Sequence, residues 1–70
     1  MKSFELLRSL RRRATRLGID HSERPAGGGD VLVRHGGRTT TVPMHRHDLP
    51  TGSWRAIQRQ LDVKEGELED

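Results

Sequence analysis

Two short runs of strand-forming residues surround a pair of glycines in the middle of this 70-residue chain. Residues 30–35 are rich in Val and residues 38–42 in Thr, and β-branched side chains favour strands. Gly36 and Gly37 between the runs fit a two-residue hairpin turn, which needs left-handed backbone. Pro43 has no N–H to donate to a ladder, so the second run should end there. These features predict an antiparallel hairpin at the centre of the fold.

Helical patterns lie on both sides of this hairpin. Ser3 is a suitable N-terminal cap, and apolar residues then recur at helical spacing from about residue 4 to residue 17. Gly18 is a suitable C-terminal stop. The expected apolar stripe consists of Phe4, Leu6, Leu7, Leu10, Ala14 and Leu17. The opposite face carries five arginines, for which we expect a partner surface: Arg8, Arg11, Arg12, Arg13 and Arg16.

A further strand and a second helix complete the predicted order. Residues 19–24 are expected to form a short edge strand that stops before Pro25. Thr51 is the expected cap of the second helix, whose core face contains Trp54, Ile57 and Leu61. The order α-β-β-β-α predicts an α+β fold, with a three-stranded antiparallel sheet and both helices on one face. A chain of this length allows one domain, 1–70.

The charge of the chain is unevenly distributed. Residues 1–61 hold twelve Lys and Arg against five Asp and Glu, whereas residues 62–70 form an acidic tail with a balance of −4. A basic body favours polyanions such as RNA or DNA, and most of its cations are arginines, which bind phosphate with a two-pronged fork. The chain has no cysteine, which excludes a disulfide framework and a zinc–thiolate site. We expect no signal peptide or membrane span, and a cytoplasmic protein.

Three segments of the chain carry a resemblance to a known family. The chain resembles the HicA family of toxins in three segments, and their order and spacing are part of the resemblance. The segments are residues 1–6, the end of a predicted strand at 40–43, and residues 49–57. The last segment is similar to the family's Gly-Thr-Leu-Arg signature, with Ser53 and Trp54 in place of Thr and Leu. The resemblance implies a fold like the double-stranded-RNA-binding domain. It also implies a metal-independent mRNA endoribonuclease, without cofactor, that forms a hetero-oligomer with a HicB-like antitoxin.

The chain departs from the family at the catalytic position. The family's Gly-Ser-His falls on Gly28, Gly29 and Asp30, so an aspartate stands where the resemblance implies the catalytic histidine. A histidine with an ordinary pKa of about 6.5 can take the proton of a ribose 2′-hydroxyl. An aspartate ordinarily titrates near pH 4 and is a much weaker base. The replacement is an engineered inactivation, the mark of a natural binding protein, or a sign that another histidine serves.

The remaining candidates lie around the hairpin and in the loop after it. Arg34 and Arg38 flank the glycine turn and are expected to contact RNA phosphates near the sheet surface of Asp30. In the loop, His45 and His47 lack the further ligands that a metal site needs. We expect His45 and Arg46 to contact RNA there instead. Beside the turn, His35 is expected to be exposed.

Two functions remain open from the sequence. The first is the RNA-cleaving toxin of a toxin–antitoxin pair, impaired here by Asp30. The second is a non-catalytic RNA-binding module, which the same basic charge supports and the aspartate favours.

Overall fold

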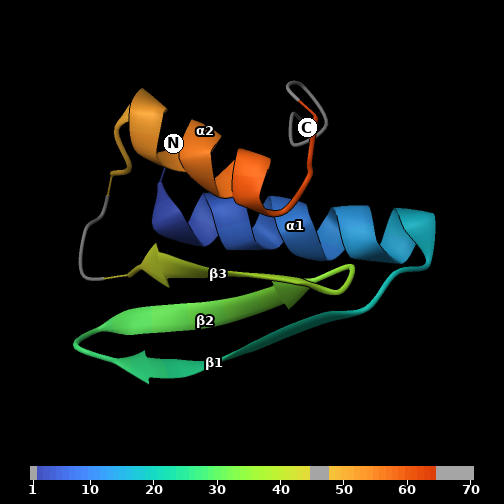
Figure 1. The fold of residues 1–70 in the computed structure, drawn as a ribbon, viewed down its shortest axis with the longest axis horizontal. Coiled ribbons are helices and arrows are strands. Elements are labelled where there is room, and N and C mark those ends of the chain that lie inside the picture. The colour runs from blue at the N-terminus through green and yellow to red at the C-terminus, as the bar shows by residue number, and fades with distance from the viewer. Residues whose placement is uncertain (1, 45–47, 65–70) are drawn as a thin grey trace.

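The structure is a computed structural model that describes residues 2–44 and 48–64. Its three strands form one antiparallel sheet in the order β1-β2-β3, and its two helices pack beside them (Figure 1). The predicted α+β fold, with the order α-β-β-β-α, is therefore confirmed. The elements are α1 (Ser3–Leu17), β1 (His21–Gly27), β2 (Asp30–His35), β3 (Arg38–Pro43) and α2 (Thr51–Gln60).

The central hairpin forms as its glycines require. Gly36 and Gly37 have φ angles of 59° and 85°, the left-handed backbone of a tight two-residue turn. His35 pairs with Arg38 across the turn, and β2 has its predicted bounds. The third strand is one residue longer than predicted, because Pro43 still pairs with Asp30.

The first strand corrects one prediction. We expected it to end before Pro25, but β1 continues through Pro25 to Gly27. β1 is an edge strand that pairs only with β2, and a proline is tolerated at an edge, where one side of the strand makes no ladder. A register shift follows between Pro25 and Gly27, where the chain turns toward β2.

The helix ends show one confirmed and two wrong predictions. Gly18 ends α1 in left-handed backbone, with its N–H donating to the Ala14 carbonyl. Ser3 and Thr51 are not the N-caps, however, because each is the first helical residue of its helix. Ser3 Oγ instead donates to the Pro43 carbonyl at 3.3 Å. This bond joins the start of α1 to the end of β3.

The buried face of α1 differs from the predicted stripe at both ends. Leu6 and Leu10 are fully buried and mark the centre of the packed face, whereas Phe4 is 56% exposed. Phe4 lies roughly a third of a helical turn away from that centre. Leu17 has the right helical phase but lies in the last turn, where it is 50% exposed. The core joins α1 to the sheet, α2 and the following segment: Leu6, Leu7, Leu10, Val33, Val42, Leu49, Ile57, Leu61 and Val63.

The two faces of the sheet have different surroundings. Strand residues alternate between faces, and residues paired across strands share a face. Glu23, His35 and Thr40 therefore share one face, here called the helix face. Side chains of α1 reach Glu23 and His35, and Gln60 of α2 bonds Thr40. The other face, here called the open face, carries Ser22, Arg24, Leu32, Arg34, Thr39 and Thr41.

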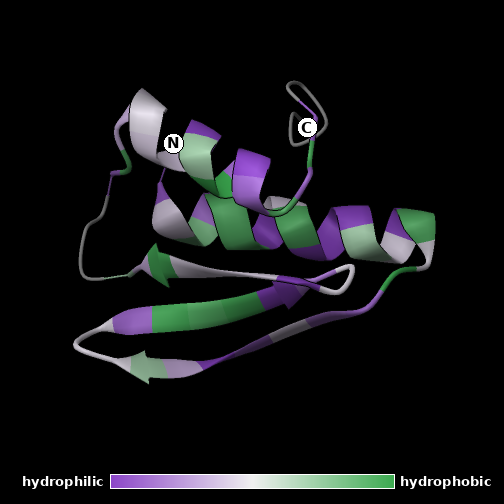
Figure 2. Cartoon of the chain, viewed as in Figure 1, coloured by the Kyte–Doolittle hydropathy of each residue, from purple (hydrophilic) through white to green (hydrophobic). Residues whose placement is uncertain are grey.

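Hydropathy follows this division. Figure 2 shows hydrophobic residues concentrated along β2 and on α1. Val33 is fully buried on the helix face, while its neighbour Leu32 is only partly buried on the open face. Among the residues described, no helix is both long and apolar enough to cross a lipid bilayer.

Candidate nucleic-acid interface

The open face brings two arginines onto the surface that carries Asp30. Because side chains alternate along β2, Asp30, Leu32 and Arg34 point to this face in turn. Arg24 of β1 pairs with Leu32, so it lies diagonally from Arg34, at the spacing of about 7–8 Å typical of diagonal neighbours. A shallow depression covers this region, lined by Ser22, Arg24, Leu32, Arg34, Gly37 and Thr39. Both arginines are exposed.

Asp30 itself lies at the end of this surface, as the first residue of β2. It is half-buried and pairs with Gly27 on one side and Pro43 on the other. The preceding Gly28 is exposed, with a φ of 61° and open space around its Cβ position. The left-handed backbone of the turn therefore explains the glycine at this position.

Arg34 and Arg38 do not share the surface that we expected them to share. Arg34 lies on the open face, four residues along β2 from Asp30, roughly 13 Å away. Arg38 pairs with His35 and therefore points to the helix face, where its Nη2 lies 3.9 Å from Asp62 Oδ2. Strand alternation separates the two arginines, although they are close in sequence. Arg24 takes the place that the sequence reasoning gave to Arg38.

The other predicted contacts lie outside the described residues. His45, Arg46 and His47 belong to the segment 45–47, so their predicted contacts with RNA stay predictions. Within residues 2–44 and 48–64, no three His, Asp or Glu side chains are grouped closely enough to hold a metal ion.

His35 corrects another prediction, because it is 1% exposed rather than solvated beside the turn. It belongs to a chain of hydrogen bonds between the helix face and α1. Arg13 Nη1 lies 2.8 Å from His35 Nε2, and the two Nδ1 atoms of His35 and His21 are 2.9 Å apart. His21 Nε2 then lies 2.7 Å from Glu23 Oε2. Arg11 closes the chain by donating two hydrogen bonds to the Glu23 carboxylate.

The order of donors in this chain fixes the proton on each ring. An arginine can only donate, so His35 Nε2 accepts from Arg13 and His35 Nδ1 carries the hydrogen. That hydrogen is donated to His21 Nδ1, which leaves His21 Nε2 to donate to Glu23. Both nitrogens of each ring are occupied by these bonds. The described histidines are therefore structural and are not placed to act on RNA at the open face.

Burial and charge shift the ionisation of this cluster. Burial is the main reason that the pKa of His35 is lowered from 6.5 to about 4, and the positive charge of Arg13 acts in the same direction. Hydrogen bonding from Arg11 is the main reason that the pKa of Glu23 lies below its ordinary value. Neutral His35 and ionised Glu23 are therefore the forms on which this part of the fold depends.

This cluster was not predicted from the sequence. All five arginines of α1 were expected on an outer face, but Arg11 bonds Glu23 and Arg13 bonds His35. Arg13 lies within a quarter turn of Leu6 and Leu10, so a helical wheel would have placed it near the sheet. The alternation of His21 and Glu23 in one strand was the other available signal.

No protein-family model and no curated protein matches this chain.

Proposed function

We propose that this chain binds RNA on the open face of its sheet, as a HicA-like toxin domain whose Asp30 leaves the ribonuclease reaction without its histidine base. One observation carries the proposal. Arg24 and Arg34 stand exposed on the same face as Asp30, and the helix contacts described are made with the other face.

The chemistry of this face suits a single RNA strand. Two guanidinium groups at diagonal spacing can each bind a phosphate with two parallel hydrogen bonds. Leu32 between them offers apolar surface to a sugar or base, and the hydroxyls of Ser22 and Thr39 are neutral hydrogen-bonding groups. Phosphate contacts of this kind position a strand without reading its sequence.

Cleavage would need a base that the described part of this face does not supply. Metal-independent RNA cleavage begins when a base takes the 2′-hydroxyl proton and the oxygen attacks the adjacent phosphate. Of the residues described, the histidines are His21 and His35, and both are engaged on the helix face. A carboxylate at position 30 is a weaker base and repels phosphate. We therefore propose slow or negligible cleavage by the chain as it stands.

We also propose a protein partner and a cellular location for this toxin. A HicB-like antitoxin would cover the open face with acidic or apolar groups and form a hetero-oligomer with this chain. The toxin would act on mRNA in the cytoplasm. The alternative function is a non-catalytic RNA-binding module, which is favoured by the lack of a histidine on the described open face.

Replacing Arg34 with alanine should weaken binding of a labelled single-stranded RNA about tenfold at low salt, because a hydrogen-bonded charge is lost. The slope of log affinity against log salt should fall by roughly one. Fluorescence anisotropy over a series of salt concentrations measures both quantities.

The matched control is Arg16→Ala, which removes the same charge from the last turn of α1. It should reduce affinity less than Arg34→Ala. Equal effects of the two substitutions would show that binding depends on total charge and not on the open face. A wild-type affinity that is independent of salt would contradict phosphate binding altogether.

A further inference from the structure

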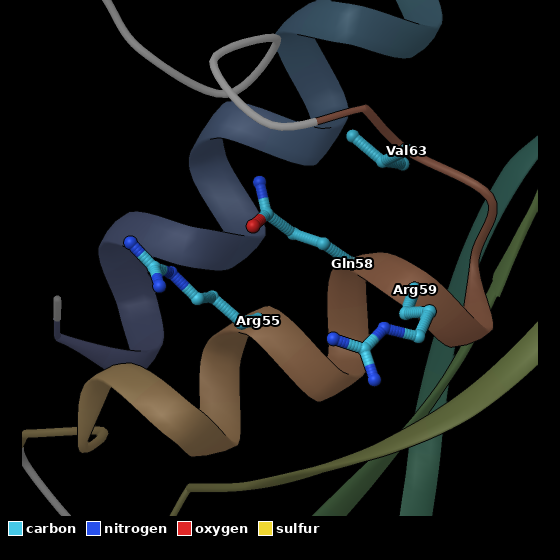
Figure 3. Close-up of a pocket in the computed structure, with 4 residues that line it drawn as sticks. All are labelled: Arg55, Gln58, Arg59 and Val63. Carbon is cyan, nitrogen blue, oxygen red and sulfur yellow. The ribbon is translucent and has the colours of Figure 1, made fainter.

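A second pocket lies on α2, which packs against the helix face and so lies away from the open face. Arg55, Gln58, Arg59 and Val63 line this pocket, which has a volume of about 180 Å³ (Figure 3). Its wall is braced by the backbone, because the Val63 N–H donates to the Gln58 carbonyl at 2.8 Å. The pocket is therefore a formed part of the domain.

Gln58 is the unusual member of this pocket. Its side chain is 4% exposed, and its Nε2 has no hydrogen-bond partner among the described residues. A side-chain amide nitrogen has two hydrogens to donate, and burying such a donor without an acceptor is unfavourable. Nearly all buried polar groups in folded proteins find a partner. The burial of Gln58 is thus explained if a bound ligand accepts a hydrogen bond from its side-chain amide.

The surroundings of Gln58 favour a negatively charged acceptor. Arg55 and Arg59 are one helical turn apart, on either side of Gln58 in the sequence, and both are exposed. The Arg55 guanidinium carbon lies 5.9 Å from the centre of the Trp54 ring, a cation–π contact that helps to hold the charged group in place. Figure 3 shows Arg55 and Arg59 on opposite sides of Gln58 with their guanidinium groups pointing in different directions, and all three side chains line the same pocket.

We propose that this pocket binds a carboxylate side chain from an acidic segment of a partner protein. The small size of the pocket suits one side chain better than a drug-sized molecule or cofactor, whose sites begin at about 300 Å³. A carboxylate has two oxygens, of which one can accept from the Gln58 amide and the other from a single N–H of an arginine. Val63 gives the pocket an apolar wall, which suits the methylenes of a glutamate better than a ribose phosphate.

The test uses a fluorescein-labelled peptide of alternating glutamate and leucine, six residues long, and a counterpart in which glutamine replaces glutamate. The full-length chain should bind the glutamate peptide and should bind the glutamine peptide at least tenfold more weakly. Gln58→Met removes the donors while keeping the length of the side chain, and should weaken glutamate-peptide binding about tenfold or more. Arg16→Gln removes a positive charge from the last turn of α1 and should leave peptide affinity within twofold, which separates the effect of the pocket from that of total charge.

If Gln58→Met fails to fold, the proposal can still be tested directly on the wild-type chain. In the wild-type chain, the side-chain amide resonances of Gln58 should shift on addition of the glutamate peptide and stay fixed with the glutamine peptide. Equal binding of the two peptides, or unmoved Gln58 resonances, would overturn the proposal. If the peptide binds only after the chain's own acidic residues at 65–70 are neutralised, the pocket is assigned to that segment. This result would overturn the proposal of a partner protein. Displacement of the peptide by RNA would assign the pocket to nucleic acid instead.

Discussion

Replacing Asp30 with histidine should raise metal-independent cleavage of single-stranded RNA by about a hundred- to ten-thousand-fold, the range typical of general acid–base catalysis. The substitution supplies a base whose ordinary pKa of about 6.5 lies near the pH of the assay. It also removes a negative charge from the surface where Arg24 and Arg34 would hold the phosphates. The rate should be measured in excess chelator on a long unstructured RNA.

Asp30→Ala separates these two effects. It removes the negative charge without adding a base, so it should bind RNA better than the wild type but cleave it no faster. Equal cleavage by the alanine and histidine variants would contradict a base at position 30. If the histidine variant binds RNA and leaves it intact, the non-catalytic binding module becomes the correct function.

Lowering the pH should destabilise the fold through protonation of His35. This loss of stability should begin well above the pH at which exposed carboxyl groups titrate. The unfolded chain takes up a proton on this ring near pH 6.5, but the folded chain resists it until about pH 4. The contribution of His35 to stability is therefore complete above pH 6.5 and is lost as the pH falls toward 4. The expected loss in the free energy of unfolding is about 2 kcal/mol between pH 7.5 and 5, and about 3 kcal/mol by pH 4.

Burial is the main reason that the folded state resists this proton, and the hydrogen-bond chain acts in the same direction. A protonated His35 would present N–H groups to Arg13, which can only donate, so that contact would be lost. Glu23 adds to the loss of stability at lower pH, because its pKa lies below its ordinary value and its ion pair with Arg11 disappears on protonation. For a small domain, a loss of about 3 kcal/mol is a large part of the total stability.

Urea unfolding at several pH values measures this effect. His35→Gln is the matched variant, since glutamine can accept from Arg13 and donate to His21 but does not titrate. Its stability should change little between pH 7.5 and 5. A wild-type stability that stays constant over that interval, or a glutamine variant with the same pH dependence, would contradict a neutral buried His35.

Much of the fold could be predicted from local sequence signals. The two glycines at 36 and 37 determine the hairpin, since few other residues adopt the positive φ angles of its turn. Gly18 likewise ends α1 where predicted. The extension of β1 through Pro25 could not be predicted, because a proline is tolerated or excluded according to whether its strand lies at an edge.

The candidate site was less predictable, because it depends on pairing between strands. The family resemblance identified position 30, and strand alternation then determines which arginines share its face. Arg38 looked equivalent to Arg34 in sequence, but the two-residue turn places their side chains on opposite faces. The burial of His35 depends on Arg13 and His21, which are distant in sequence and meet only when α1 packs on the sheet.

RNA binding by the open face is tested most directly by an NMR titration of the chain with a short single-stranded RNA, following backbone and arginine side-chain resonances. We predict that the shifts cluster on the open face, at Arg24, Leu32 and Arg34, while His35 on the helix face stays unchanged. Shifts confined to α2, or spread evenly over the exposed arginines, would contradict an RNA-binding open face.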